Sequence, residues 1–394
     1  MSKIDFLVGN AQILNSMDSV PSLPMFSERV VIFLEKLSRE LMNHPGIRQY
    51  VDVMSYAYWI RKASIEKEIK THADYKSRIG RGVAFHIAPS NVPVNFAVSM
   101  TSSILAGNAS IIRVSNRLFE QVDIICMALN KLLSDEFMDL QNYLCIIRYD
   151  HDDIISSELS LMCDIRIIWG GDNTINSIRK LPVRPRSIEM AFADRHSIAI
   201  IDSDYYMTQE AHRIAKDFYT DTFYTDQNAC SSPRLVVWLG NRVDEARKSF
   251  WEELGEIVAS EYDIKPIQVM DKYSSFCRVA MVRDDISLIS HDNYITRIEV
   301  ESLFPELMEY KNGSGYFFEY IANELEDIIP ILNIRCQTVS VLGVDKRDIK
   351  NLVFKYGTRG VDRIVNVGQT MGLEFVWDGY HMIENMTRLV YLYE

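Results

Sequence analysis

The sequence has no run of about 18 consecutive apolar residues, which excludes a membrane-spanning helix. It also lacks a CxxC pair, and its six dispersed cysteines favour reduced thiols in a cytoplasm over a zinc site or a disulfide framework. Lys and Arg form no basic stripe and the formal net charge is −12, so we expect no nucleic-acid partner. The first apolar run is interrupted by Gly and Asn and makes a poor secretory signal. We therefore expect a cytoplasmic protein.

What the chain does contain is enough apolar sequence for a large core. Hydrophobic residues make up 47% of the 394 residues, which is sufficient for two core-bearing domains. Helical periodicity marks residues 28–41 and about 46–70. From residue 82 onward, short apolar runs at 82–87, 110–113, 143–147 and 165–169 alternate with helical segments at 94–105, 118–133 and 154–162. This alternation predicts an α/β fold with a parallel, doubly wound sheet.

Two turns in this region are candidates for binding an anionic ligand. Residues 88–93 (APSNVP) lie between a strand and a helix, and Gly170-Gly171 opens into a helix near 174–180. Helix N-termini at the carboxyl edge of such a sheet favour anions. The chain has no GxGxxG motif, and in the alternative interpretation Pro89 and Pro93 only stiffen an ordinary crossover.

One cysteine has a context unlike the other five. Cys230 lies in Gln-Asn-Ala-Cys-Ser-Ser-Pro, just before the apolar run 235–239. A thiolate near backbone N–H donors can attack an activated acyl carbonyl, so we interpret Cys230 as a nucleophile. A small buried filler is the alternative, and packing is the role expected of the other cysteines.

The second half of the chain also predicts an α/β domain. It contains a strand at 234–239, a helix at about 244–261, a less regular middle and a strand at 338–342. We expect an amino-terminal and nucleotide-binding domain over 1–193 and a catalytic domain over 194–375. The tail, 376–394, either returns to the first domain or pairs with another subunit.

The order of these motifs resembles the aldehyde dehydrogenase superfamily, and more closely its fatty acyl-CoA reductase branch of the LuxC type. HIAPSNVP, GNASIIRVSN, IIWGGDN and QNACSSP are similar to the loop, turn, glycine strand and nucleophile segments of the superfamily, in the expected order. FADRHSIAII, GVDRIVNVGQ and WDG are similar to the branch. The resemblance covers residues 80–379. It implies two α/β domains, one Rossmann-type and nucleotide-binding, the other bearing the cysteine.

The resemblance also implies catalytic roles. Cys230 matches the nucleophile, and Asn91 matches the asparagine that forms an oxyanion hole with the Cys230 backbone N–H. Glu189 matches the general base of aldehyde oxidation. The glycine-glycine-lysine that follows this glutamate in the superfamily is replaced here by residues 191–194, Ala-Phe-Ala-Asp, which puts the role of Glu189 in doubt.

The cofactor implied is a nicotinamide nucleotide. Arg113 stands where the superfamily usually has a lysine near the adenosine ribose, and a guanidinium there favours the 2′-phosphate of NADPH, with NADH as the alternative. The residues we assign to cofactor binding are Pro89, Ser90, Arg113, Ser115, Gly170 and Gly171.

The resulting prediction is an NADPH-dependent acyl-CoA reductase, an oxidoreductase that forms an aldehyde through a thioester intermediate on Cys230. No metal is required. The alternatives are an aldehyde dehydrogenase acting oxidatively and an acyl-accepting subunit without redox activity. The resemblance implies an acyl-CoA or acylated protein as the donor and an acyl-activating synthetase as a partner. We also expect a homo-oligomer.

Overall fold

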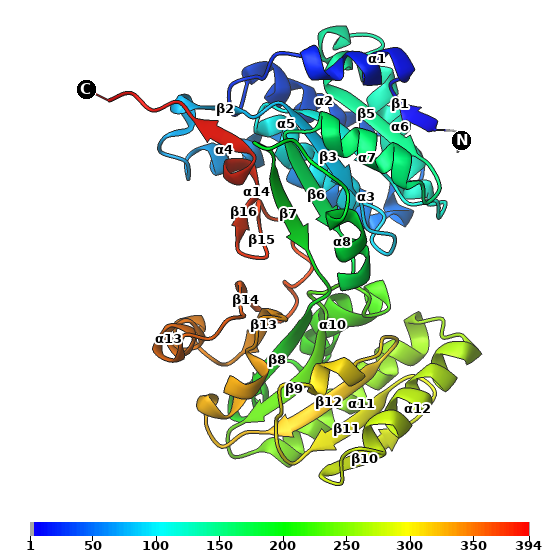
Figure 1. Cartoon of the computed structure of the whole chain (residues 1–394). Coiled ribbons are helices and arrows are strands. Elements are labelled where there is room, and N and C mark those ends of the chain that lie inside the picture. Colours follow the sequence, from blue (N-terminus) through cyan, green and yellow to red (C-terminus); the bar gives the residue numbers. More distant parts are fainter. Residues whose placement is uncertain (1–3, 394) are drawn as a thin grey trace. The chain divides into compact units, whose positions relative to one another are not determined.

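The chain divides into two compact units, shown in Figure 1. The computed structural model describes residues 4–393. One unit comprises Met1–Ala193 and Leu373–Glu394, and the other comprises Asp194–Gly372. The second unit is therefore a continuous insertion in the first.

The first unit is built on a six-stranded sheet in the order β1-β5-β4-β3-β6-β7. Strands β3 to β7 pair in parallel, and β1 pairs antiparallel with β5. From β3 the chain adds β4 and β5 on one side and then β6 and β7 on the other, which is the doubly wound order that the sequence predicts. The strands are β1 (Asp5–Val8), β3 (Val83–Ile87), β4 (Ala109–Arg113), β5 (Leu144–Arg148), β6 (Ile165–Trp169) and β7 (Ile188–Phe192).

Helices cover both faces of this sheet. They are α1 (Ala11–Ser16), α2 (Glu28–Met42), α3 (Val51–Trp59), α4 (Lys62–Ile69), α5 (Asn95–Leu105), α6 (Glu120–Leu133), α7 (Asp153–Met162) and α8 (Asp172–Arg179), with short 3-10 turns η1 (Met17–Ser19), η2 (Ile47–Gln49), η3 (Tyr75–Ser77) and η4 (Met138–Tyr143). The single helical stretch expected over 46–70 is wrong, because it is divided into η2, α3 and α4.

Alternate strand residues enter two separate cores, because successive side chains of a strand point to opposite faces. Ala84 and Ile112 pack with helices α2, α3, α5 and α6. Phe85 and Ile111 pack on the other face with α1, α7 and α8. Both faces of the sheet are buried, which accounts for the nearly continuous apolar runs in its strands.

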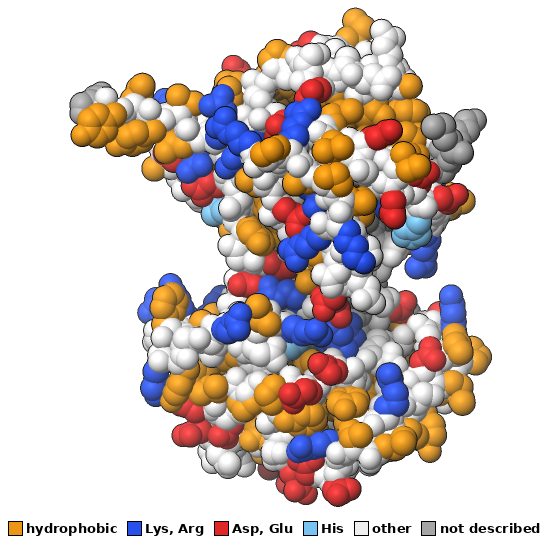
Figure 2. All heavy atoms as spheres, viewed as in Figure 1, with side chains coloured by type: hydrophobic (Ala, Val, Ile, Leu, Met, Phe, Trp, Pro, Cys, Tyr) orange, Lys and Arg blue, Asp and Glu red, His pale blue; other side chains and the backbone are white. Residues whose placement is uncertain are grey.

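The carboxyl-terminal tail returns to the first unit. It forms β15 (Val376–Trp377), β16 (Tyr380–His381), α14 (Met382–Asn385) and β17 (Thr387–Leu389), and β17 pairs antiparallel with β2 (Arg78–Gly80). Asn108 fastens this tail by donating a 3.0 Å hydrogen bond from Nδ2 to the Met386 carbonyl. Beyond β17, residues 390–393 extend outward with exposed apolar side chains, visible at the carboxyl end in Figures 1 and 2.

The second unit contains a seven-stranded sheet in the order β10-β11-β12-β9-β8-β13-β14, parallel except for β10. Its strands are β8 (His196–Asp202), β9 (Pro233–Leu239), β10 (Ile286–His291), β11 (Thr296–Val300), β12 (Tyr316–Ile321), β13 (Cys336–Leu342) and β14 (Arg363–Asn366). Its helices are α9 (Ser203–Tyr206), α10 (Ala211–Thr222), α11 (Val243–Glu261), α12 (Pro266–Ala280) and α13 (Lys346–Tyr356), with η5 (Phe223–Thr225), η6 (Leu307–Tyr310) and η7 (Leu325–Ile331).

This sheet also has a core on each face. Ile198 and Leu235 pack with α12 and α13, whereas Ala199 and Val236 pack with α10 and α11. The second unit is therefore α/β, as the sequence predicts. Within the described residues we find no helix with the length and apolarity that a membrane crossing demands.

Candidate active site

Three loops of the first unit meet at the carboxyl edge of its sheet. Ile87 at the end of β3 is paired with Arg113 of β4 and with Ile168 of β6, so these strands end at nearly the same level. The loops that follow carry the residues predicted to bind the cofactor: Pro89, Ser90, Ser115, Gly170 and Gly171. Because β3 is the strand at which the order reverses, this edge is where open α/β sheets bind ligands.

Asn91 lies in the turn between β3 and α5, and its side chain is exposed. The turn begins with a 2.9 Å hydrogen bond from the Ala88 N–H to the Arg113 carbonyl. Asn95, in the first turn of α5, is buried, and its Oδ1 has no hydrogen-bond partner among residues 4–393. Asn95 is a polar group at this edge that the sequence did not single out.

Arg113 ends β4 with its guanidinium held against Tyr149. Its Cζ lies 4.6 Å from the centre of the Tyr149 ring, and Nη2 donates a 3.4 Å hydrogen bond to the Tyr149 carbonyl. If Arg113 only braced the loop, Glu120 at the start of α6 would be a suitable carboxylate partner, but Glu120 accepts a hydrogen bond from Tyr50 instead. Nε of Arg113 is buried and has no partner among the described residues. The guanidinium of Arg113 therefore keeps one N–H unsatisfied within residues 4–393.

Arg148 places a second guanidinium beside Ser115. It ends β5, the strand next to β4, and its Nε donates a 3.1 Å hydrogen bond to the Ser115 carbonyl. Its Nη2 is buried without a partner within the described part of the chain. The sequence held a signal for this residue, since β4 and β5 both end in Ile-Ile-Arg. Together, Arg113 and Arg148 fit a negatively charged group such as a nucleotide phosphate.

Gly170 and Gly171 connect β6 to α8. Gly171 is the N-cap of α8, and no side chain provides the capping hydrogen bond. A Cβ at Gly171 would meet no atom within 4 Å, so close packing does not demand glycine there. Asp172 brings a carboxylate into the first turn of α8 and weakens the attraction of this helix end for a phosphate.

Glu189 lies in β7 and pairs with two arginines. One oxygen accepts hydrogen bonds from Arg166 at 2.9 and 2.6 Å, and the other accepts one from Arg179 at 2.7 Å. The Arg166 side chain is only 4% exposed, so the ion pair between Arg166 and Glu189 is largely shielded from water. A carboxylate bound in this way has both oxygens occupied, which disfavours proton abstraction.

Cys230 lies in a tight turn before β9 and is partly exposed. Its carbonyl accepts a 2.7 Å hydrogen bond from the Ser197 hydroxyl, and the Ser232 N–H donates to the Ala229 carbonyl at 3.1 Å. Asp226 and Gln227 enter the turn with φ of 53° and 55°, a left-handed conformation that non-glycine residues adopt only where neighbouring contacts impose it. The cysteine backbone is therefore fixed.

Gln227 is the side chain that clamps this turn. It is fully buried, and its Oε1 accepts hydrogen bonds from the backbone N–H groups of Gly315 and Tyr316 at 2.8 and 3.0 Å. Its Nε2 donates to the carbonyls of Pro233 and Tyr316 at 3.1 and 3.3 Å. One amide thus joins the cysteine turn to β9 and β12.

Arg234 supplies positive charge behind the cysteine. Its guanidinium is buried and donates to the carbonyls of Gln227 and Asn312. Burial lowers the pKa of Arg234, and the electrostatic interaction with Cys230 counteracts part of that shift. The same interaction favours the thiolate form of Cys230. Neither Gln227 nor Arg234 was assigned a role from the sequence.

Four of the other five cysteines are buried and are therefore poor nucleophiles. Burial raises the pKa of four thiols to about 12, so they stay protonated near neutral pH; these are Cys126, Cys145, Cys163 and Cys336. Only Cys230 and Cys277 are partly exposed, and Cys277 lies within α12.

The fold of the chain is that of the aldehyde dehydrogenases. It matches a structure of lactaldehyde dehydrogenase with a TM-score of 0.67 and 14% identity, covering 97% of this chain and 90% of that one. A 1-pyrroline-5-carboxylate dehydrogenase from Thermus thermophilus matches with a TM-score of 0.62 and 10% identity, covering 96% and 82%. The predicted fold class is therefore confirmed.

Within this class, the sequence matches the family described as acyl-CoA reductase (LuxC) over residues 14–295. The chain belongs to this family. The long-chain acyl-protein thioester reductase of Photobacterium phosphoreum is 28% identical over 314 residues, which cover 75% of this chain and 59% of that protein. The one from Vibrio harveyi is 24% identical over 301 residues, covering 75% and 60%. The chain thus spans about three fifths of the length of these curated relatives.

Proposed function

We propose that the protein reduces a fatty acyl thioester to an aldehyde through an acyl-enzyme on Cys230, with NADPH as the reductant. The observation that carries the proposal is the environment of Cys230, a partly exposed thiol in a clamped turn with a buried guanidinium beside it. Membership of the acyl-CoA reductase family supports the choice of an acyl thioester as substrate.

The residues of the chain account for acyl transfer as follows. The Cys230 thiolate attacks the thioester carbonyl to form a tetrahedral oxyanion, whose collapse expels the thiolate of the donor and leaves the acyl group bound to Cys230 as a thioester. Asn91 and the Cys230 backbone N–H donate hydrogen bonds to the oxyanion, which lowers the barrier to its formation. Hydride addition to the acyl-enzyme would form a second oxyanion in the same position, and its collapse would break the C–S bond, release the aldehyde and return the Cys230 thiolate. Asn91 belongs to the first unit and Cys230 to the second, so their cooperation is a prediction.

The carboxyl edge of the first sheet would hold the cofactor, whose nicotinamide would supply the hydride when bound. Arg113 and Arg148 are the residues we assign to its phosphates, because each keeps a buried, unpartnered N–H within the described residues. Arg113 favours NADPH, since a 2′-phosphate offers the bidentate anion that a guanidinium binds best. Pro89, Ser90 and Ser115 border the same edge.

The ion pairs of Glu189 favour a reductive over an oxidative reaction, because they keep this carboxylate from acting as a general base. A general base that activates water would hydrolyse the acyl-enzyme to a carboxylic acid. Both oxygens of Glu189 are engaged by Arg166 and Arg179, and this arrangement protects the acyl-enzyme from hydrolysis. An oxidative aldehyde dehydrogenase, the alternative, needs that carboxylate to be free.

The donor is a long-chain acyl group on CoA or on a protein. Curated relatives are named long-chain acyl-protein thioester reductases, which favours a long chain and adds an acylated protein to acyl-CoA as a donor. An acyl-activating synthetase is the partner that would supply such a protein.

The deciding experiment compares Cys230→Ala with Cys277→Ala, the other partly exposed cysteine. Each purified variant is incubated with long-chain acyl-CoA and NADPH while NADPH absorbance and aldehyde are followed. We expect Cys230→Ala to form no aldehyde and to take up no radiolabelled acyl group, and Cys277→Ala to behave as the wild type. Wild-type turnover in Cys230→Ala would overturn the proposal. Acyl labelling of the wild type without NADPH oxidation would instead identify an acyl-accepting subunit.

A further inference from the structure

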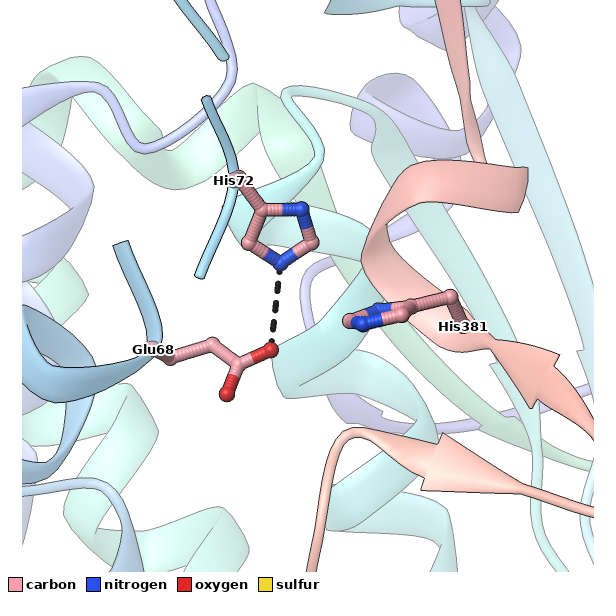
Figure 3. Close-up of side chains that lie close together, drawn as sticks. All are labelled: Glu68, His72 and His381. Carbon is pink, nitrogen blue, oxygen red and sulfur yellow. Dashed lines mark hydrogen bonds and ion pairs between the residues drawn. The ribbon is translucent and has the colours of Figure 1, made fainter. Parts of the chain in front are cut away.

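We propose that Glu68, His72 and His381 bind a divalent transition-metal ion, with Zn²⁺ as the expected occupant. One carboxylate oxygen and one ring nitrogen from each histidine all lie within 4.8 Å of one another. Figure 3 shows the three side chains converging from two separate segments of the chain. The group lies in the first unit, whereas Cys230 lies in the second, and the proposed reduction does not use it.

The fold brings these residues together without help from a metal. Glu68 is near the end of α4, and His72 follows four residues later, which places Oε1 and Nε2 3.1 Å apart. His381 ends β16, in the tail. Two contacts join the tail to the segment after His72, the pairing of β2 with β17 and a 2.8 Å ion pair between Arg78 and Glu384. The ligands are therefore largely preorganised.

The spacing of the ligand atoms suits a tetrahedral ion. Zn–N and Zn–O bonds of about 2.0–2.2 Å place neighbouring ligand atoms about 3.3 Å apart. Glu68 and His72 are already near this distance at 3.1 Å, and the ligand atom of His381 lies within 4.8 Å of both. Two imidazoles and one carboxylate form a set that Zn²⁺ binds, whereas Mg²⁺ and Ca²⁺ prefer oxygen ligands.

An ion pair between Glu68 and His72 accounts for only part of this arrangement. His381 packs edge-on against His72, with ring centres 4.6 Å apart. Its Nδ1 is buried and has no hydrogen-bond partner in the part of the chain that the structure describes. Buried polar atoms are normally satisfied, so the unsatisfied imidazole of His381 is a second observation that a bound ion would explain. A cation explains all three side chains at once.

The sequence did not reveal this group because its ligands include no cysteine and His381 is remote from the other two. The spacing Glu-x₃-His alone is common on helices as an ion pair. His212 of α10 and Glu253 of α11 also form a histidine–carboxylate pair, with 3.3 Å between Nδ1 and Oε2, and no third ligand accompanies them among the described residues. They provide a matched control.

The test is a Co²⁺ titration of full-length, chelator-treated protein, followed by visible d–d absorption, with bound Zn²⁺ counted by mass spectrometry. A Cys230→Ala background removes binding to the reactive thiol. We expect one equivalent of metal with tetrahedral or five-coordinate Co²⁺ absorption. Each of Glu68→Gln, His72→Gln and His381→Gln should weaken binding at least 10-fold, and His212→Gln should leave it unchanged.

Circular dichroism shows whether each variant is folded, and Glu68→Gln, whose side chain is partly exposed, is the variant expected to perturb the fold least. Absence of stoichiometric binding in the parent protein would overturn the proposal, as would a folded Glu68→Gln variant that binds as tightly as its parent. Both readouts are independent of aldehyde formation, so failure of the proposed reductase activity would not affect them.

Discussion

Arg113 keeps its charge partly buried without a carboxylate partner among the described residues, which is costly unless an anion binds there. We predict that Arg113→Ala lowers kcat/KM with NADPH by about 1.5 to 3 kcal/mol, the range for hydrogen bonds to charged groups. NADH, which has no 2′-phosphate, should be affected little. Arg117→Ala is the control, because Arg117 is exposed and its guanidinium lies over the Phe119 ring. Equal losses with both cofactors, or a wild type that prefers NADH, would contradict the assignment.

We assign Asn91 to stabilisation of the transition state. Loss of such an interaction lowers kcat and leaves KM nearly unchanged. We predict that Asn91→Ala lowers kcat about 10²-fold or more, as expected when one oxyanion donor is removed, with little change in KM. Asn116→Ala serves as the control, since Asn116 is an exposed amide on the same sheet edge that bonds Asp150 at 2.7 Å. Steady-state kinetics with a saturating cofactor test this role of Asn91. A raised KM with unchanged kcat would assign Asn91 to substrate binding instead.

At the scale of single residues, the sequence suggested reacting groups but did not suggest the side chains that hold them in place. Cys230 and Asn91 were identified because their short motifs resemble those of a known superfamily. Gln227 and Arg234 were missed because their partners are backbone groups of distant strands and loops, which no local pattern reveals. The glycine-asparagine turn was found as a motif, but its contacts show a structural role: Asn108 bonds the Arg81 N–H and the tail.

At the scale of elements, the cysteine turn depends on Gln227. We predict that Gln227→Ala destabilises the second unit by about 3 kcal/mol or more, because several buried backbone groups lose their partners at about 1–3 kcal/mol each. The rate of Cys230 alkylation should change as well, since the turn would no longer be held in its left-handed conformation. Urea unfolding and iodoacetamide labelling measure the two effects. Gln209→Ala, at a partly exposed site in the same unit, should show neither effect, and a fully stable Gln227→Ala variant would refute the clamp.

The strands predicted from apolar runs were confirmed, whereas strands that carry buried charge were missed. β11 and β12 lie in the part expected to be irregular. Their polar pattern arises from Arg297 and Glu319, which form a 2.7 Å ion pair inside the unit, and Glu319 also accepts hydrogen bonds from Arg247, Trp238 and Trp251. Hydrophobic periodicity treats every charged residue as solvent-exposed. A strand whose charged side chains form a buried ion-pair network is therefore not predicted from its sequence.

The break between α3 and α4 escaped the sequence for a similar reason. No glycine or proline marks it. The start of α4 is set by Glu35 of α2, whose carboxylate accepts a 2.7 Å hydrogen bond from the Lys62 N–H. This bond lowers the pKa of Glu35 and caps α4 from outside the local sequence. Helix boundaries that depend on tertiary contacts cannot be read from propensity alone.

At the scale of the whole molecule, the second unit is one uninterrupted segment with cores of its own on both faces of its sheet. The first unit, in contrast, is assembled from two segments that are far apart in sequence. We predict that residues 194–372 fold alone with a single cooperative thermal transition, because every strand of their sheet lies within this segment. Calorimetry and far-UV circular dichroism of the excised segment test this, and a chain without a cooperative transition would contradict it.

The stability of the first unit should depend on the carboxyl-terminal tail, whereas the stability of the second unit should not. Four tail side chains are buried in its core: Phe375, Met382, Ile383 and Met386. Loss of each large buried apolar side chain costs about 2–5 kcal/mol, and the sum reaches the whole stability of a typical domain, about 5–15 kcal/mol. Truncation after Gly372 should therefore abolish the first unit's thermal transition and leave that of the second. Truncation after Arg388 removes residues 389–393, whose side chains are exposed, and is the control that should keep both transitions. Two transitions in the chain cut at Gly372 would show that the first unit folds without its tail.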